Sequence, residues 1–227
     1  MSSERVDVAA YGHITYDTIY EDFEEKNTLG ALANFWSGII NGEDDVSVRL
    51  VPCAIGKAII LVDKSTAIRV GRGNLNIKKN EAKPIPSKWH HIMYLNQLPE
   101  TDFIEKIKEG FISADITSGP PPSFDLLSKL DYLFISDEDL FMPVEELALL
   151  VKGWVIMHHA AGSFCSNGKE SFEIQTDIIQ NINVLGAGDM FAASFISKKI
   201  NTDLGVEDCV KHAHNQTTKL LLKENNL

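Results

Sequence analysis

Short apolar segments alternate with amphipathic ones along most of this 227-residue chain, and this alternation limits the folds that are open to it. Apolar runs typical of buried strands occupy residues 6–11, 46–54, 58–62, 67–70, 92–95, 111–116, 132–135 and 154–157. Helical spacing or helix-boundary residues mark segments 28–40, 100–109, 123–130, 143–153 and 204–223, and the run that follows 189. Strands separated by helices predict an α/β fold with a mainly parallel sheet and helices on both faces.

Glycine and other turn residues set the expected ends of these elements. We expect the first strand to end at Gly12, two strands to meet in a turn at Gly56, and a helix to end at Gly110. Ser123 can cap the short helix that follows it. An Asn-Gly pair inside residues 163–174 predicts a β-hairpin.

Composition and charge exclude several classes of protein. Apolar residues make up 44% and charged residues 23%, which is ordinary for a globular protein, and the length suits one domain over residues 1–227. A net charge of -11 argues against nucleic acid and against a membrane surface, since both attract clustered Lys and Arg. Three cysteines without close spacing predict neither a disulfide framework nor a zinc site. Because we find no membrane-spanning run and no secretory signal, we expect a cytoplasmic protein.

Residues 186–189 give the strongest indication of chemistry. Gly186, Ala187 and Gly188 are small, which lets the backbone approach another molecule closely. They precede Asp189 and an apolar run that predicts a helix, so their N–H groups would point at an anion bound at the helix start. An acid inside an anion site suggests phosphoryl transfer to a hydroxyl, with Asp189 as the base. The alternative is a tight turn followed by an acid that only interacts with the helix dipole.

The longer segment NVLGAGDMFAASFI, residues 183–196, resembles the C-terminal signature of the ribokinase-like (PfkB-type) carbohydrate kinases. The resemblance implies a three-layer α/β/α sandwich with a mainly parallel central sheet. It implies an ATP-dependent kinase that transfers the γ-phosphoryl group to a hydroxyl of a sugar, polyol or nucleoside, with Mg²⁺ as cofactor. It also implies Asp189 as the catalytic base and Gly186, Ala187 and Gly188 as the anion hole.

Two N-terminal segments are similar to the substrate-binding part of that family. GHITYDTIY places Asp17 where the family has an Asp that hydrogen-bonds substrate hydroxyls. LGALAN, residues 29–34, is similar to a Gly-Gly-x-x-x-Asn segment, with Gly30 and Asn34 as the matching residues. The resemblance therefore implies acceptor binding by all three. The alternatives are a turn acid, a glycine at the entry to a helix, and an exposed Asn.

The resemblance also indicates where the metal and the nucleotide would bind. FISDEDL, residues 134–140, is similar to a strand end followed by Asn-x-x-Glu, and it puts Asp139 in the place of a residue that helps to hold Mg²⁺. Gly162 matches a glycine of a turn near the nucleotide, and Asn215 resembles an Asn near the adenine pocket. A cap by Ser136, followed by acids in a first helical turn, explains that segment equally well.

The chain departs from the family pattern in three places. Asn183 and Leu185 stand where the family usually has Asp and Thr, which puts a monovalent-cation site in doubt. The short stretch between Asp17 and Gly30 predicts a reduced or absent lid, and with it a monomer or weak dimer. These departures, together with Ser136 in the place of the family's Asn, motivate a second hypothesis, a catalytically weakened protein of the kinase fold that binds sugar or nucleotide in a regulatory role. Without a Gly-x-Gly-x-x-Gly after the first strand, and without a P-loop, nicotinamide enzymes and P-loop kinases fit poorly.

Overall fold

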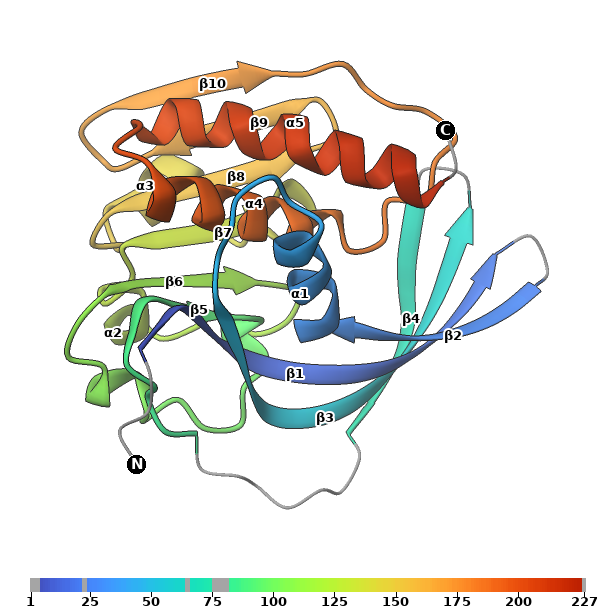
Figure 1. Cartoon of the computed structure of the whole chain (residues 1–227), viewed down its shortest axis with the longest axis horizontal. Helices are drawn as coiled ribbons and strands as arrows, with labels where there is room; N and C mark the ends of the chain where they lie inside the picture. Colours follow the sequence, from blue (N-terminus) through green and yellow to red (C-terminus); the bar gives the residue numbers. More distant parts are fainter. Residues whose placement is uncertain (1–4, 22–23, 64–65, 75–81, 226–227) are drawn as a thin grey trace.

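A computed structural model describes residues 5–21, 24–63, 66–74 and 82–225, and its centre is a single sheet (Figure 1). The strands lie in the order β10-β9-β8-β7-β6-β5-β1-β3-β4, with β2 paired to β1. Parallel neighbours are β1 (Val6–Glu21), β3 (Val48–Asp63), β5 (Ser87–Ile92), β6 (Phe111–Ile116), β7 (Tyr132–Ser136) and β8 (Trp154–His159). Antiparallel pairings add β2 (Glu24–Ala31), β4 (Thr66–Asn74), β9 (Gly162–Ser166) and β10 (Ser171–Gln175). The mainly parallel sheet confirms the prediction from the sequence.

Helices cover both faces of this sheet. One face carries α1 (Leu32–Ile40), α4 (Ala187–Asn201) and α5 (Val206–Glu224), which Figure 1 shows lying side by side. The opposite face carries α2 (Phe124–Leu127), α3 (Val144–Ala148) and the 3-10 turns η1 (Leu95–Gln97) and η2 (Ile104–Lys106). The fold is therefore the three-layer α/β/α sandwich expected from the sequence. In the part of the chain that the structure describes, no helix has the length and apolar character needed to cross a membrane.

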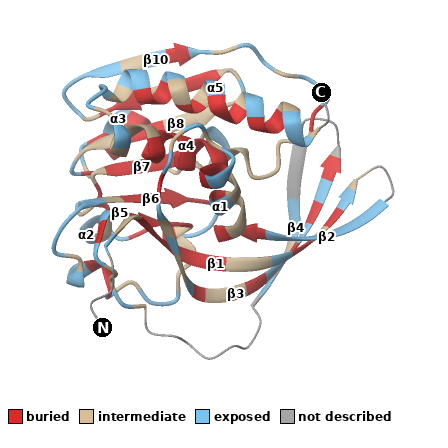
Figure 2. Ribbon diagram, viewed as in Figure 1, coloured by how far each residue is buried: buried red, intermediate tan, exposed pale blue. Residues whose placement is uncertain are grey.

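The central strands are buried on both faces. In β1, Val8 and Ala10 join the apolar cluster under α1, α4 and α5, whereas Ala9 and Tyr11 join the cluster under α2 and α3. Successive side chains of a strand point to opposite faces, so one strand supplies both layers of the core. Figure 2 shows the buried residues concentrated in these strands and on the inner sides of the helices. Burial on two faces explains why the strands read as continuous apolar runs.

β1 and β3 continue beyond the central sheet and form, with β2 and β4, a small projecting sheet that is visible in Figure 1. We call this part the lid, and it comprises residues 14–21, 24–31, 54–63 and 66–74. The sequence left a reduced lid and an absent lid open, and the structure has a small one. Part of its inner face is apolar and packs against Leu185, in the loop before α4; the residues of this apolar part are Ile19, Ala58, Ile60 and Val62.

Two expected strand boundaries are wrong because glycines lie inside strands. β1 continues through Gly12, with an irregularity between Gly12 and His13, and β3 continues through Gly56 without a turn. A Cβ at Gly12 would lie 2.8 Å from the Cβ of Met93, and one at Gly56 would lie 3.4 Å from the carbonyl oxygen of Gly73. Gly12 therefore permits a close approach of β1 to Met93, whereas a side chain at Gly56 would make only an ordinary contact.

Four expected helices are also shorter than predicted. Segments 123–130 and 143–153 form only α2 (Phe124–Leu127) and α3 (Val144–Ala148). Residues 28–31 belong to β2, and α1 begins only at Leu32. Segment 100–109 forms only the turn η2, although Phe103 and Ile104 are buried in the core. The apolar spacing there reflects packing of side chains and not a continuous helix.

Two local predictions are confirmed. The Ser123 hydroxyl accepts a hydrogen bond from the amide of Leu126 at 3.3 Å, which caps α2. β9 and β10 form the predicted hairpin.

Candidate active site

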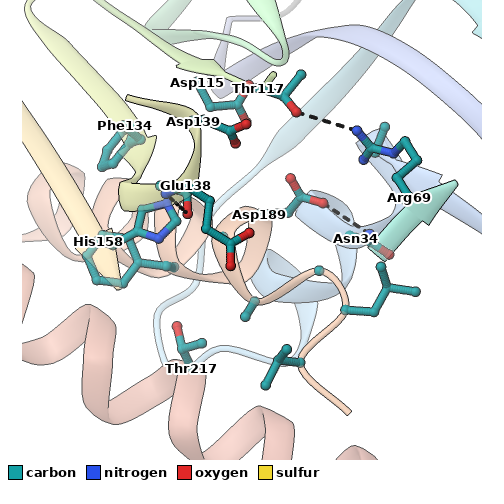
Figure 3. Close-up of a pocket in the computed structure, with 18 of the residues that line it drawn as sticks. Asn34, Arg69, Asp115, Thr117, Phe134, Glu138, Asp139, His158, Asp189 and Thr217 are labelled. Atoms are coloured by element: carbon teal, nitrogen blue, oxygen red, sulfur yellow. Dashed lines mark hydrogen bonds between the residues drawn. The ribbon is translucent and has the colours of Figure 1, made fainter. Parts of the chain in front are cut away.

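A cavity of about 520 Å³ lies at the carboxyl ends of the central strands, between the lid and the loop that leads into α4 (Figure 3). Ligands of parallel α/β sheets bind at this edge. Of the residues singled out in the sequence, the cavity is lined by Asp17, Asn34, Asp139, Gly186, Ala187, Gly188 and Asp189. Three others, Gly30, Gly162 and Asn215, are not among its lining residues.

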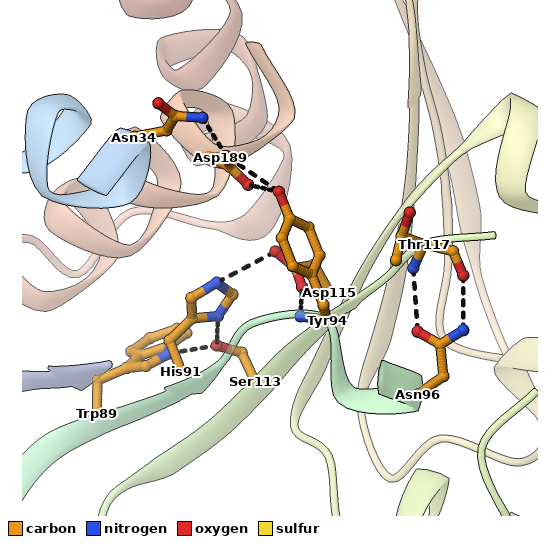
Figure 4. Close-up of polar contacts among 9 residues, drawn as sticks. All are labelled: Asn34, Trp89, His91, Tyr94, Asn96, Ser113, Asp115, Thr117 and Asp189. Carbon is orange, nitrogen blue, oxygen red and sulfur yellow. Dashed lines mark hydrogen bonds and ion pairs between the residues drawn. The ribbon is translucent and has the colours of Figure 1, made fainter. Parts of the chain in front are cut away.

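Asp189 faces this cavity from the first turn of α4 and is only 5% exposed. Asn34 donates a hydrogen bond from Nδ2 to Oδ2 of Asp189 at 3.0 Å. The hydroxyl of Tyr94 lies 3.0 Å from Oδ1 and 3.2 Å from Oδ2 of the same carboxylate (Figure 4). Neutral donors from two distant parts of the chain therefore fix the position of the carboxylate.

The packing of α1 against α4 brings Asn34 and Asp189 together. A Cβ at Gly38 would lie 2.8 Å from the Cβ of Ala193, so the two helices approach each other closely there. Asn34 lies one helical turn before Gly38, and Asp189 lies one turn before Ala193. Residues four apart share a helix face, so the close contact places the amide beside the carboxylate.

Burial gives Asp189 an unusual acidity. It raises the pKa of Asp189 from 3.8 to about 6, while the hydrogen bonds from Asn34 and Tyr94 and the positive charge of Arg69 act in the opposite direction. At neutral pH the carboxylate is ionised, yet it is more basic than an exposed Asp. This combination suits a general base.

At the loop before α4, two backbone N–H groups have no backbone acceptor among the residues that the structure describes. Gly186 has a φ of 81°, in the left-handed region that favours glycine, and it precedes the helix. Ala187 donates its amide to the carbonyl of Val184 at 3.0 Å, and Met190 donates to Gly186 at 3.0 Å. The amides of Gly188 and Asp189 lie between these two and have no acceptor within the helix. An anion can therefore bind to the amides of Gly188 and Asp189, whereas the amide of Ala187 already donates to Val184.

Asp17 points from β1 of the lid into the cavity, with 5% exposure and no hydrogen-bond partner for its buried Oδ1 among the described residues. Burial raises the pKa of this carboxyl group. A buried acceptor without a partner is satisfied when a ligand hydroxyl donates to it. A Cβ at Gly30 would overlap the carboxylate of Asp17. Gly30 therefore leaves space for Asp17, a role that differs from the backbone contact to substrate expected from the sequence.

A buried polar cluster lies beneath Asp189, and sequence reasoning missed it (Figure 4). Tyr94 follows β5 with a φ of 53°, and its amide donates to Oδ1 of Asp115. Oδ2 of Asp115 lies 3.8 Å from Nε2 of His91. The hydroxyl of Ser113 lies 2.9 Å from Nδ1 of His91 and accepts a hydrogen bond from Nε1 of Trp89 at 2.7 Å. Asp115 stands out in the sequence as the one charged residue of an apolar strand, which was the available signal.

The two titratable groups of this cluster favour their uncharged forms. Burial raises the pKa of Asp115 well above its usual value, and repulsion from Asp189 adds to this. Burial lowers the pKa of His91 to about 3. The cluster therefore supports Tyr94 without placing a second negative charge beside Asp189.

The far end of the cavity, beyond residues 186–189, is mainly apolar. Ile179, Val184 and Leu221 line it, together with the hydroxyl-bearing Thr217 of α5. Oγ1 of Thr217 is buried and has no hydrogen-bond partner among the described residues. Asn215, which the sequence assigned to this end, is instead exposed on α5.

Gly162 serves the β8–β9 turn and does not line the cavity. Its φ is 142°, and a Cβ there would overlap the carbonyl of Ile174 in β10. The histidines on the cavity wall nearby include His158, near the end of β8, and His214, on α5. Burial lowers the pKa of both to about 4, so they are neutral at physiological pH.

Acidic side chains gather where β7 ends. The turn η3 (Asp137–Asp139) lines the cavity together with Ser136, whose hydroxyl accepts a hydrogen bond from the amide of Glu138 at 3.4 Å. Ser136 therefore caps the turn η3, as one of the two interpretations of the sequence predicted. Across the described ranges, no group of three or more His, Cys, Asp or Glu side chains is arranged to hold a metal ion. Carboxylates at a cavity wall suit Mg²⁺ bound partly through water.

Similar folds occur in solved structures of kinases. A ribokinase from Thermotoga maritima aligns with a TM-score of 0.67 and 18% identity, covering 93% of this chain and 92% of that chain. A ribokinase from Cryptococcus neoformans var. grubii serotype A in complex with ADP aligns with a TM-score of 0.65 and 13% identity, covering 92% and 91%. A pyrophosphate-dependent kinase in the ribokinase family, complexed with a pyrophosphate analog and myo-inositol, aligns with a TM-score of 0.64 and 16% identity, covering 94% of each chain.

Comparisons of sequence alone give no relative. No protein-family profile matches the chain, and no curated protein sequence matches it. The structural likeness shows that this chain has the ribokinase fold.

Proposed function

We propose that this chain, which has the ribokinase fold, is an ATP-dependent kinase that transfers the γ-phosphoryl group to a hydroxyl of a sugar, polyol or nucleoside. The observation that carries the proposal is Asp189, a buried carboxylate that faces the cavity beside two free backbone amides. Its pKa of about 6 suits proton transfer from a hydroxyl at neutral pH.

The reaction assigns one task to each side chain. Asp189 takes the proton of the acceptor hydroxyl as the new O–P bond forms and the bond between phosphorus and the ADP oxygen breaks. The amides of Gly188 and Asp189 hold the negative charge of the phosphoryl group in transit. Asn34 and Tyr94 keep the carboxylate in place, and Asp17 accepts a hydrogen bond from a second hydroxyl of the acceptor.

The donor end of the cavity favours a nucleotide over pyrophosphate. Among proteins with similar folds, one was solved with ADP and another depends on pyrophosphate. Apolar walls from Ile179, Val184 and Leu221 suit the flat face of a base, which pyrophosphate lacks. The unpartnered hydroxyl of Thr217 is available to a polar edge of the same base. Comparing ATP with pyrophosphate as donor tests this choice directly.

The acidic wall fits a requirement for Mg²⁺. Asp139, with Asp137 and Glu138 beside it, supplies the hard oxygen ligands that Mg²⁺ prefers, directly or through water. The metal would supply charge neutralisation for phosphates that bind beside this acidic wall.

Replacement of the base tests the proposal. Asp189→Asn keeps the shape of the side chain but cannot accept the proton, so we expect ADP release in the presence of acceptor to fall about 10²- to 10⁴-fold. Asp203→Asn, an exposed acid outside the cavity, is the matched control and keeps full activity. Undiminished turnover of the Asp189 variant would contradict the assignment.

The second candidate is a regulatory protein that binds sugar or nucleotide without efficient turnover. It is favoured by the two hydrogen bonds on Asp189, which weaken it as a base, and by the engaged amide of Ala187. Calorimetric titration beside a turnover assay separates the two candidates. Binding of ATP and sugars, with no ADP release over a broad acceptor panel, would support the regulatory role.

A further inference from the structure

Arg69 lies on the inner face of the lid, toward the cavity. In the pairing of β4 with β3 it stands directly opposite Ile60, which belongs to the buried inner face. Paired residues of neighbouring strands point to the same side of a sheet. Figure 3 shows the guanidinium on the same side of Asp189 as Asn34, with Glu138 and His158 on the other side. Arg69 therefore belongs to the end of the cavity assigned to the acceptor.

Few of the donors of Arg69 are used. Nη1 lies 3.4 Å from Oγ1 of Thr117, and the guanidinium carbon lies 5.9 Å from the centre of the Tyr94 ring. Within the described ranges, no carboxylate forms an ion pair with it; Asp17 and Asp189 interact with its charge only at longer range. A guanidinium carries five N–H donors in a planar fork, so most of them are available to a ligand.

The charge of Arg69 is unusual for this cavity. Acids outnumber basic residues of fixed charge on its wall: Asp17, Asp115 and Asp189 near the acceptor end, Asp137, Glu138 and Asp139 on the opposite wall, and Asp177. Lys57 is also near the cavity, but it is exposed and alternates along β3 with the buried residues of the inner face. An anion that enters the acceptor end of the cavity would therefore lie close to the guanidinium of Arg69.

We propose that Arg69 binds an anionic group, a carboxylate or a phosphate, on the acceptor, so that the preferred acceptors are sugar acids or sugars that already carry a phosphate ester. This inference rests on the proposed function and narrows its substrate class. The acceptor is then held at three points: the reacting hydroxyl at Asp189, a second hydroxyl at the unpartnered Oδ1 of Asp17, and the anion at Arg69. Three separated contacts of different chemistry fix one orientation.

Matched acceptors and one substitution test this inference. The probes are a sugar, its aldonic acid and its monophosphate ester, each with a free hydroxyl, assayed by ADP release with wild type and Arg69→Gln. We expect the wild type to prefer an anionic member of the set, and the variant to lose roughly 10- to 100-fold in kcat/KM for that member. The ratio of anionic to neutral kcat/KM is the readout, because any effect of Arg69 on Asp189 is common to both acceptors and cancels.

The aldonic acid and the phosphate ester distinguish a carboxylate from a phosphate as the bound anion. The control is Arg49→Gln, the same change at an exposed arginine outside the cavity, and it leaves the ratio of anionic to neutral kcat/KM unchanged. A wild type that prefers the neutral sugar would overturn the inference, as would a variant that loses activity equally on all three, since Arg69 would then only hold the lid to Thr117. If no acceptor is phosphorylated, the proposed function fails separately. Calorimetric titration of the same three compounds then decides the inference, which requires tighter binding of an anionic member and its loss in Arg69→Gln.

Discussion

At Asp189, two hydrogen bonds and burial act on the pKa in opposite directions. Burial raises the pKa, and donation from Asn34 and Tyr94 lowers it, leaving a value of about 6. A donor to the charged form of an acid stabilises that form. Tyr94 is therefore a positioning residue that also limits how basic the carboxylate becomes.

Tyr94→Phe removes the hydroxyl and keeps the ring. Without that donor the pKa of Asp189 rises, so the acidic limb of kcat/KM against pH moves from near pH 6 to higher pH. A pH–rate profile with the preferred acceptor measures the shift. Tyr20→Phe, which removes a phenol hydroxyl that bonds Glu25 in the lid outside the cavity, leaves the limb in place. A Tyr94 variant with the wild-type limb would show that this hydrogen bond does not act on the base.

Thr217 offers a second test at the residue scale. Its buried hydroxyl has no partner among the described residues, so Thr217→Val removes no hydrogen bond from the free protein. We expect an unchanged or slightly higher melting temperature, together with a KM for ATP that rises about 5- to 10-fold, the cost of one lost hydrogen bond. If the melting temperature falls and KM for ATP is unchanged, the hydroxyl has a structural partner and no part in nucleotide binding.

Among the elements, the lid makes an apolar contact with the loop before α4 through Leu185. Leu185 lies in the loop before α4 and packs on the apolar inner face of the lid formed by Ile19, Ala58, Ile60 and Val62. The same position departs from the Thr of the kinase family. The departure exchanges a polar side chain for an apolar one that packs on the inner face of the lid.

Leu185→Ala weakens this contact and lets water reach the phosphoryl group more often. Loss of part of a half-buried leucine costs about 1 kcal/mol, or roughly a 5-fold change in the closed fraction. We expect ADP release without acceptor to rise several-fold relative to transfer, and KM for the acceptor to rise. Leu149→Ala, at a leucine 72% exposed beyond the cavity, is the control. If the ratio of ADP release without acceptor to phosphoryl transfer is the same in both variants, the lid does not exclude water through Leu185.

For the whole molecule, the acids buried around the site reduce stability at neutral pH. The pKa of Asp189 is about 6 in the folded chain, against an ordinary value of 3.8 for an unperturbed Asp. Between these values the folded state holds a proton that the unfolded state has released. The free energy of unfolding therefore falls as pH rises from about 4 to about 6, and the loss from this group is on the order of 3 kcal/mol at most.

Asp189→Asn removes that titration. We expect the variant and the wild type to have similar stability at pH 4, and the variant to be more stable by up to about 3 kcal/mol at pH 8. Urea unfolding from pH 4 to pH 8 measures the difference, with Asp203→Asn as the control. A difference that does not change with pH would show that Asp189 titrates normally.

The sequence alone determined the layers of the fold and the residues whose chemistry is local. Alternating apolar and amphipathic runs predict the mainly parallel sheet and its helices. A strand buried on both faces is a continuous apolar run, whereas a helix buried on one face has apolar residues at helical spacing. Gly186 to Asp189 are contiguous, so their small size and their place before a helix are readable without a structure. Asp17 and Asn34 were found through order along the chain and resemblance.

Only the tertiary structure decided which distant residues meet and which matched residues do not. Tyr94, Asp115 and Arg69 reach the site through strand order and through the pairing of β3 with β4, which no local pattern encodes. Gly30 and Gly162 proved to serve packing and a turn, because a glycine looks the same in sequence whether it meets a ligand or another part of the chain. The role of each of these residues depends on which distant residues it contacts in the folded chain, and those contacts depend on the packing of the whole chain.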